Sequence, residues 1–285
     1  MQVVATVQTM RAMVKEWKQH GLSVGLVPTM GYLHKGHASL IRHAVSECDR
    51  VVVSIFVNPM QFGPREDLET YPRDMARDKA ICKENGAAIV FAPEALEMYP
   101  NDFATFVKVE RLGGNLCGHS RPIHFRGVCT VVNKLFNIIS PDRAYFGRKD
   151  AQQCIILGRM VRDMNLDVEI VDCPTVREPD GLAVSSRNVY LSSEERDAAK
   201  VLYRAIVVAE EMFQKGERKS APLITRMREI LDSETLVRAD YVEVVNPQTL
   251  SAIQKIDRPV LVALAIYLGK TRLIDNTTLD PKTDL

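Results

Sequence analysis

Two histidines three residues apart are the feature of this sequence best suited to chemistry. His34 and His37 flank Gly36; they follow an apolar run at residues 24–27 and precede a helical pattern that begins near Ala38. Backbone N–H groups at a helix N-terminus attract anions, and imidazoles beside them can donate hydrogen bonds to phosphate oxygens. The pair therefore suits stabilisation of negative charge during transfer of a nucleotide group. A metal site is the rival interpretation, but no third ligand of suitable spacing lies nearby in the sequence.

Two further segments carry charges that suit phosphate. Residues 146–153 leave a predicted strand and enter a predicted helix, which places them at the edge where open α/β sheets bind ligands. Within them Lys149 offers a positive charge and Asp150 is a candidate helix cap. Residues 181–188 combine small residues with two serines and Arg187, which predicts a phosphate clamp at a domain junction. Solvated charges on a capped helix, and a polar linker, are the respective structural alternatives.

Amide and guanidinium side chains are the remaining candidates. Gln61 follows the apolar run at 51–57, and its neutral amide suits a small polar substrate such as a hydroxy acid. Gln152 and Gln153 present amides on different faces of a predicted helix. The loop residues Arg121 and Arg126 suit either an anion or solvent.

The elements that must position these residues alternate between strand and helix. Apolar runs predict strands at 24–27, 51–57, 88–91, 144–146 and 168–171, and helical spacing predicts helices at about 10–20, 40–48, 74–85, 128–139 and 150–164, with a long loop over 58–72. This alternation predicts a parallel, doubly wound α/β sheet. The sequence has no Gly-x-Gly-x-x-Gly or Walker-type loop, so a nucleotide would need another cradle.

The pattern changes after about residue 175. Ser192 and Glu195 have the spacing of a capping box for a long helix that runs to about Gln214 and stops at Gly216. A second helix at 221–231 and strands at 241–245, 260–268 and 272–274 follow. We therefore expect two domains, residues 1–175 and a smaller α+β domain over residues 176–285.

Composition narrows the class of protein. The 285 residues are 46% hydrophobic and carry a formal net charge of +1, which allows a sizeable core and gives no basic surplus for nucleic acid. The six cysteines are scattered without a Cys-x-x-Cys pair, against a disulfide framework or a zinc site. The longest apolar run, 260–268, is too short to span a bilayer, and we see no signal peptide. A reducing cytoplasm, with no membrane or nucleic-acid partner, is the expectation.

With these residues together, the chain closely resembles the pantoate–β-alanine ligases, or pantothenate synthetases, almost end to end. The His-x-Gly-His element alone is shared across the nucleotidylyltransferase superfamily, so the ordered series is more specific. It comprises Pro28-Thr29-Met30-Gly31, His34-x-Gly36-His37, Asn58-Pro59-Met60-Gln61-Phe62, His124-Phe125-Arg126-Gly127, Lys149-Asp150 with Gln152-Gln153, and Ser185-Ser186-Arg187-Asn188.

The resemblance implies a Rossmann-like N-terminal domain, a small C-terminal lid domain that carries the Ser-Ser-Arg-Asn loop at the junction, and a homodimer. It implies ATP-dependent condensation of (R)-pantoate with β-alanine to pantothenate through a pantoyl adenylate, with release of AMP and pyrophosphate. Mg²⁺ would accompany ATP, and its protein ligands are not implied.

The resemblance also implies roles residue by residue. Gln61 and Gln153 would hold pantoate, and Gln61 would also lie near β-alanine. The catalytic residues would be His34, His37, Lys149 and Arg187, with His37 as proton donor. The ATP contacts would be Met30, Gly31, Tyr32, Leu33, His34, Lys35, Gly36, His37, Gly147, Arg148, Lys149, Asp150, Val176, Val184, Ser185, Ser186 and Arg187.

Three positions depart from the family pattern. Lys35 stands where an acidic residue is common, Arg148 where glutamate or glutamine is common, and Ile123 where glycine is usual. Lys35 and Arg148 would add positive charge near the expected phosphates. Two other functions stay open at this point: another nucleotidylyltransferase with the same histidine motif, and a non-catalytic ATP-binding sensor.

Overall fold

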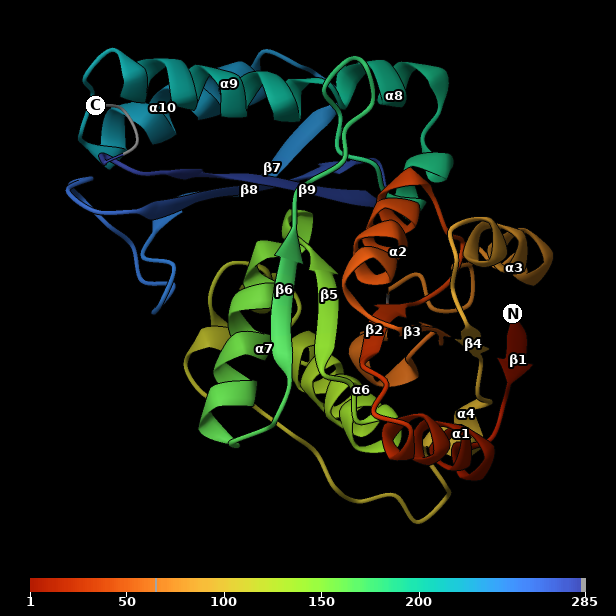
Figure 1. Cartoon of the computed structure of the whole chain (residues 1–285). Helices are drawn as coiled ribbons and strands as arrows, with labels where there is room; N and C mark the ends of the chain where they lie inside the picture. The colour runs from red at the N-terminus through yellow and green to blue at the C-terminus, as the bar shows by residue number, and fades with distance from the viewer. Residues whose placement is uncertain (65, 283–285) are drawn as a thin grey trace.

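A six-stranded parallel sheet organises the N-terminal part of the chain in the computed structural model, which describes residues 1–64 and 66–282 (Figure 1). The strands are β1 (Gln2–Val4), β2 (Val24–Thr29), β3 (Arg50–Ile55), β4 (Ile89–Phe91), β5 (Arg143–Gly147) and β6 (Glu169–Cys173), in the spatial order β1-β4-β3-β2-β5-β6. From β2 the chain adds β3 and β4 successively on one side, and it then returns to add β5 and β6 on the other side of β2. The order therefore reverses between β2 and β5, which is where open α/β sheets form a ligand crevice.

Helices cover both faces of this sheet and make a separate hydrophobic core on each. One core joins the strands to α1 (Val7–Gln19), α6 (His124–Ile139) and α7 (Ala151–Asp163), and the other joins them to α2 (Lys35–Glu47) and α3 (Met75–Glu84). Leu26 belongs to the first core and its neighbour Val27 to the second. Because alternate residues of β2 are buried on opposite faces, its sequence is a continuous apolar run.

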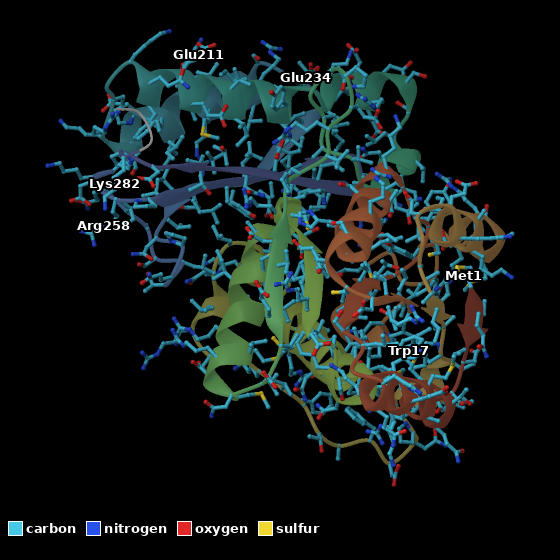
Figure 2. All side chains as sticks on the ribbon, in the orientation of Figure 1. Met1, Trp17, Glu211, Glu234, Arg258 and Lys282 are labelled. Carbon is cyan, nitrogen blue, oxygen red and sulfur yellow. The ribbon has the colours of Figure 1, made fainter. Side chains whose placement is uncertain are left out.

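A smaller antiparallel sheet lies across the carboxyl ends of β5 and β6 (Figure 1). It contains β7 (Val237–Val245), β8 (Val260–Leu268) and β9 (Thr271–Leu279), with α8 (Ser193–Ala198), α9 (Val201–Gln214) and α10 (Ser220–Asp232) on its outer side. Along β8, Val260 and Val262 pack in the core of this C-terminal unit, whereas Leu261 and Ala263 pack in the core shared with the parallel sheet. Among the exposed charges of the unit, Glu211 lies on the helical side and Arg258 on the loop before β8 (Figure 2).

Short elements fill the connections between these layers. Two are the single-turn helices α4 (Ala95–Met98) and α5 (Cys117–Ser120), and 3₁₀ turns occur at Pro59–Gln61, Leu112–Gly114, Arg148–Asp150 and Ser186–Tyr190. No helix in residues 1–64 and 66–282 is long and apolar enough to cross a membrane.

The α/β fold class predicted from the sequence is confirmed, and several boundaries differ. The long helix predicted from residue 193 is two helices, because the N–H groups of Lys200 and Leu202 donate to carbonyls three residues back and tighten the chain there. The capping box at Ser192 and Glu195 is present. The last predicted strand, 272–274, was too short, since β9 continues to Leu279. The three-residue edge strand β1 was missed. The division into domains at residue 175 remains a prediction.

Candidate active site

The end of β2 opens the crevice that holds the histidine pair. Strand β5 pairs with β2 only at Gly25 and Leu26, whereas β3 stays paired with it as far as Thr29. Pro28 has no N–H to donate to a ladder, which suits a strand that has just lost its neighbour on one side. The two central strands therefore part before their carboxyl ends.

A strained turn follows and is held from α3. Gly31 and Tyr32 both adopt positive φ, +87° and +50°. The carboxylate of Asp78 accepts hydrogen bonds from the backbone N–H groups of Tyr32 at 2.8 Å and Leu33 at 2.6 Å. Asp78 is buried, and burial raises the pKa of its carboxyl group. Sequence reasoning missed Asp78, because 46 residues separate it from Tyr32.

His34 and His37 form the N-terminal cap of α2. Nδ1 of His34 accepts from the N–H of Gly36 at 3.1 Å, and Nδ1 of His37 accepts from the N–H of His34 at 3.3 Å. The rings stack with centroids 4.0 Å apart. Since both Nδ1 atoms are acceptors, the hydrogen-bond network assigns the proton of each neutral ring to Nε2.

Both imidazoles are uncharged near neutral pH. Burial, with the nearby His37 and Lys149, lowers the pKa of His34 to about 2. Burial and Lys149 lower the pKa of His37 to about 4. The pair therefore offers two N–H donors without adding positive charge to the crevice.

Lys149 reaches the same crevice from the 3₁₀ turn after β5. Its Nζ lies 3.7 Å from Oδ1 of Asp150. The prediction that Asp150 caps α7 was wrong, because Asp150 occupies the cap position but its side chain makes no capping hydrogen bond. The two additional cations expected near phosphate form surface ion pairs instead: Arg148 with Asp172 at 2.8 Å and Lys35 with Glu178 at 3.5 Å.

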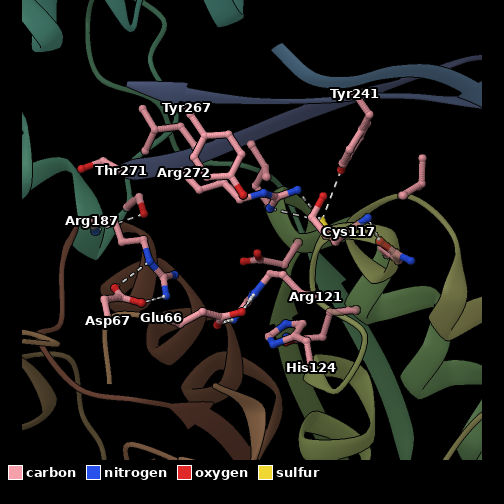
Figure 3. Close-up of a pocket in the computed structure, with 18 of the residues that line it drawn as sticks. Glu66, Asp67, Cys117, Arg121, His124, Arg187, Tyr241, Tyr267, Thr271 and Arg272 are labelled. Atoms are coloured by element: carbon pink, nitrogen blue, oxygen red, sulfur yellow. Dashed lines mark hydrogen bonds and ion pairs between the residues drawn. The ribbon is translucent and has the colours of Figure 1, made fainter. Parts of the chain in front are cut away.

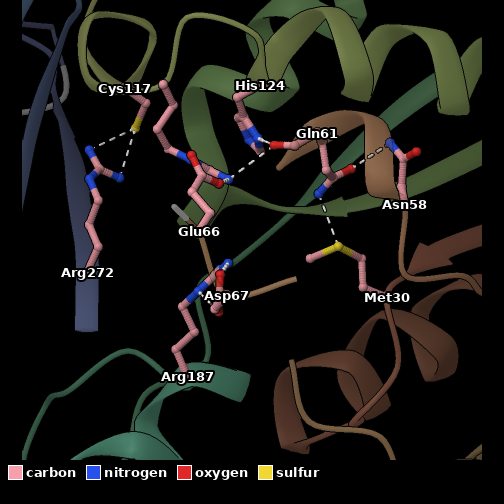
Figure 4. A network of polar contacts seen from close by, with 10 residues as sticks. Met30, Asn58, Gln61, Glu66, Asp67, Cys117, His124, Arg187 and Arg272 are labelled. Atoms are coloured by element: carbon pink, nitrogen blue, oxygen red, sulfur yellow. Dashed lines mark hydrogen bonds and ion pairs between the residues drawn. The ribbon is translucent and has the colours of Figure 1, made fainter. Parts of the chain in front are cut away.

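Gln61 is fixed by a polar network in the wall of the crevice (Figure 4). Its Oε1 accepts from Asn58 at 3.1 Å, and its Nε2 donates to Sδ of Met30 at 3.0 Å. Asn58 is itself held by the hydroxyl of Tyr99 and the carbonyl of Gly127. Asn58 was not among the predicted site residues. Its position directly after the apolar run at 51–57, near the carboxyl end of β3, was a usable signal.

The glutamine pair divides as its helical spacing predicts. Gln153 lines the crevice. Gln152 is buried, donates to the carbonyls of Leu112 and Asn115, and accepts from the N–H of Cys117. Gln153 therefore lines both cavities, whereas Gln152 lines only the larger one and its amide is committed to backbone groups.

The Ser-Ser-Arg segment docks onto the other walls of the crevice. Arg187 makes a bidentate ion pair with Asp67, both contacts at 2.9 Å, and Ser186 donates to the carbonyl of Tyr32 at 3.2 Å. Burial raises the pKa of the Asp67 carboxyl group, but the hydrogen bonds and charge of Arg187 outweigh burial, so the net shift of the Asp67 pKa is downward. Ser185 accepts from the N–H of Arg187 within its own turn. Sequence reasoning missed Asp67.

Two adjoining cavities occupy the space between the sheets. The smaller, about 230 Å³, is lined by the histidine pair, Gln61, Gln153 and Val176. The larger, about 970 Å³, extends under the C-terminal sheet past Tyr241 and Arg272 (Figure 3). Residues common to both linings are Arg121, His124, Lys149, Asp150, Gln153, Ser185 and Arg187.

The other predicted contacts divide between these linings and the surrounding shell. Arg121 pairs with Glu66 at 2.5 Å and still lines both cavities, whereas Arg126 stacks over Phe106, 4.7 Å from the ring centroid, and lines neither. Of the expected ATP contacts, the smaller cavity is lined by Met30, His34, Gly36, His37, Gly147, Lys149, Asp150, Val176, Val184, Ser185, Ser186 and Arg187, and not by Gly31, Tyr32, Leu33, Lys35 or Arg148. Across the described ranges, no three or more His, Cys, Asp or Glu side chains are placed to hold a metal.

The fold and site define a class. A doubly wound parallel sheet with a neutral His-x-Gly-His pair and a lysine at its switch point is the arrangement of a Rossmann-like nucleotide-dependent enzyme. Within that class, the family model of pantoate-beta-alanine ligase matches residues 2–278, and the chain belongs to this family of ligases.

Similar proteins agree over the full length. A pantothenate synthetase from Ruminiclostridium cellulolyticum is 57% identical over 281 residues, which cover 99% of this chain and 100% of that protein. The crystal structure of pantothenate synthetase from Thermus thermophilus is 47% identical and superposes with a TM-score of 0.93 over 97% of this chain and 99% of that one. The ligase from Francisella tularensis, solved in complex with beta-gamma ATP and beta-alanine, is 34% identical with a TM-score of 0.79, covering 97% of each chain.

Proposed function

We propose that this chain joins (R)-pantoate to β-alanine through a pantoyl adenylate built in the smaller cavity. The observation that carries the proposal is the sharing of one cavity by phosphate-directed donors and by amides. His34, His37 and Lys149 line it together with Gln61 and Gln153. The amides suit the hydroxyls and carboxylate of pantoate, and the N–H donors and the ammonium suit a triphosphate.

In the first step an oxygen of the pantoate carboxylate attacks the α-phosphorus of ATP, and pyrophosphate leaves. This step asks the protein mainly for positioning and charge stabilisation. The Nε2–H groups of His34 and His37 and the ammonium of Lys149 are the donors that meet the developing charge. Arg187 would join them by exchanging Asp67 for phosphate.

In the second step the neutral amine of β-alanine attacks the acyl carbon and AMP leaves with one carboxylate oxygen on its phosphorus. The larger cavity shares a wall with the smaller one and offers the amine a separate approach past Arg121 and His124. The complex of the Francisella tularensis ligase with beta-alanine supports an amine site in this family. No nucleophilic side chain is needed to carry the acyl group.

Mg²⁺ would neutralise phosphate charge when ATP is bound. Within the described residues, no cluster of three or more His, Cys, Asp or Glu side chains could hold the ion. The residues of the cavity therefore fit an ion held chiefly by phosphate oxygens and water, because Mg²⁺ retains waters and needs few protein ligands. On this proposal the protein contributes the surrounding donors, the histidine pair and Lys149, rather than a preformed metal cage.

Isotope exchange tests the adenylate directly. Labelled pyrophosphate should enter ATP when pantoate is present and β-alanine is absent. Oxygen-18 in the pantoate carboxylate should appear in AMP once β-alanine is added. Formation of ADP, with the label in orthophosphate, would establish an acyl phosphate route and overturn the proposal.

The same assay separates the alternatives. A nucleotidylyltransferase with a stable nucleotide product would release no AMP in response to β-alanine, and a sensor would release none at all. The family membership and the paired amides at Gln61 and Gln153 favour the ligase.

The homodimer and the cytoplasmic location that the resemblance implies are also proposals. The six cysteines are all free thiols, which suits a reducing compartment. Leu96 and Phe106 are large exposed apolar side chains, 67% and 41% accessible, that a partner could cover. Sedimentation equilibrium tests the dimer.

A further inference from the structure

Strand β9 of the C-terminal sheet contacts the catalytic turn through one buried amide. The side chain of Asn276 is only 8% exposed. Its Nδ2 donates to the carbonyl of Arg148 at 3.1 Å and to the carbonyl of Lys149 at 2.8 Å. Asn276 lies 127 residues from Lys149 in sequence, so the contact joins the two sheets.

These two hydrogen bonds tie the catalytic turn to β9, in addition to the surface ion pair of Arg148 with Asp172. Arg148–Asp150 is a 3₁₀ turn of three residues; Gly147 before it has no side chain to cap it, and Asp150 makes no side-chain capping bond at the start of α7. The carbonyls on both sides of the Lys149 α-carbon are tied to the same amide. The peptide planes that set the direction of the Lys149 side chain are therefore fixed from β9.

The preceding residue of β9 anchors a second wall of the cavity. Asp275 is buried and makes a bidentate ion pair with Arg177, at 2.6 and 3.0 Å, and it also accepts from the backbone N–H of Asn276. Arg177 directly follows Val176, in the segment that connects β6 to the Ser-Ser-Arg segment. Because Asp275 fixes the backbone that carries Asn276, the amide is itself held firmly.

We propose that Asn276 is a positioning residue for Lys149, holding its backbone so that the ammonium meets the phosphates of ATP. This inference rests on the proposed function, since it requires Lys149 to act on phosphate. It assigns the C-terminal sheet a direct part in the adenylation step.

The primary test compares Asn276→Ala with Thr277→Ala. Thr277 is the next residue of β9 and donates to Glu210 within the C-terminal unit at 2.6 Å, so its loss also removes a hydrogen bond from the strand but leaves Lys149 untouched. Asn276→Ala should slow pantoate-dependent pyrophosphate exchange by roughly 10- to 100-fold, the scale of a catalytic group displaced by less than 1 Å. Its KM for ATP should rise while the Kd for pantoate stays within about twofold of the parent value. Thr277→Ala should exchange at the parent rate, and an equal loss in both variants would overturn the proposal.

A double-mutant cycle with Lys149→Ala separates this inference from the proposed function. If Asn276 acts through Lys149, adding Asn276→Ala to Lys149→Ala should slow exchange little further. Fully additive losses would refute the positioning role while leaving Lys149 catalytic. An unimpaired Lys149→Ala enzyme would instead refute the assigned role of Lys149. Should Asn276→Ala fold poorly, Asn276→Ser keeps one donor and should show an intermediate rate.

Discussion

His34 and His37 each use their two ring nitrogens for different purposes. The Nδ1 atoms accept backbone N–H groups and start α2, and the Nε2–H groups are left free to donate into the crevice. Because each side chain caps a helix and is also proposed to meet a substrate, an alanine substitution is ambiguous: activity and stability would change together. The first prediction separates the two.

We expect His34→Asn to lose activity without losing the cap. Asparagine is a favoured N-cap residue, so the stability of the fold should stay close to that of the parent, whereas His34→Ala should cost about 1 kcal/mol. Alanine has no donor, and the shorter asparagine side chain holds its N–H groups closer to the backbone than the Nε2–H of histidine, so adenylation should fall on the order of 10²–10³-fold in each variant. Thermal unfolding and pyrophosphate exchange measure the two effects. Parent-like exchange in both folded variants would remove His34 from the chemistry.

The adjacent glutamines give a matched pair. Gln153→Ala should weaken pantoate binding about 10-fold or more, because a hydrogen bond to a charged group contributes about 1.5–3 kcal/mol. Gln152→Ala should leave pantoate affinity unchanged and lower the free energy of unfolding, since three backbone groups lose their partner and two of these hydrogen bonds are buried. Calorimetric titration and denaturant unfolding would show the reverse pattern if the assignment were mistaken.

At the scale of elements, the turn between β2 and α2 depends on α3. Asp78→Asn retains one acceptor oxygen where the carboxylate has two, so one of the Tyr32 and Leu33 N–H groups is left unpaired at a cost of about 1–3 kcal/mol. ATP affinity should fall because this turn leads into the histidine pair.

Asp74→Asn is the control for that change. Asp74 is the N-cap of α3 and its side chain accepts from Arg77, and asparagine caps a helix equally well. The charge change is the same, on the same helix. Equal Tm and equal ATP affinity in the two variants would show that the turn does not depend on Asp78.

The helices and strands could be predicted from the sequence wherever interactions between neighbouring residues determine them. The runs of β2 and β3, the start of α3 near residue 74 and the stop at Gly216 needed only periodicity and turn chemistry. The break at Ala199 and the length of β9 depend on packing between α9 and the C-terminal sheet, and no local signal marks them.

The site divides in the same way. Residues inside a motif, such as His34 and Gln153, were found because the motif also places them at a strand end. Asp67, Asp78 and Asn276 were missed because each acts on a partner tens of residues away or more. Arg187 was found, but its ion pair with Asp67 could come only from the tertiary structure.

For the whole molecule, acid should destabilise the fold before the carboxylates titrate. In the unfolded chain His34 and His37 bind protons below a pKa of about 6.5, whereas in the folded chain burial lowers their pKa values to about 2 and about 4. The unfolded state therefore binds more protons between those values, so stability rises with pH across this window and falls on acidification. Burial also lowers the pKa of His124, which acts in the same direction.

Thermal unfolding between pH 5 and 7 measures this dependence. The parent Tm should drop steadily as pH falls, and a His34→Asn, His37→Asn double variant should show a shallower slope. A parent Tm that is flat over the same interval would mean that the rings bind protons equally in the folded and unfolded chains, so that burial does not lower their pKa values.

The larger cavity has a consequence for how tightly the enzyme couples its two half-reactions. Its volume of about 970 Å³ corresponds to roughly thirty water molecules at about 30 Å³ each. On the proposed route, water in this cavity would compete with β-alanine for the pantoyl adenylate formed in the smaller cavity, and hydrolysis would return pantoate while consuming ATP. The ratio of AMP released to amide formed at limiting β-alanine therefore measures hydrolysis of the adenylate. It reports how completely water is excluded from the larger cavity during turnover.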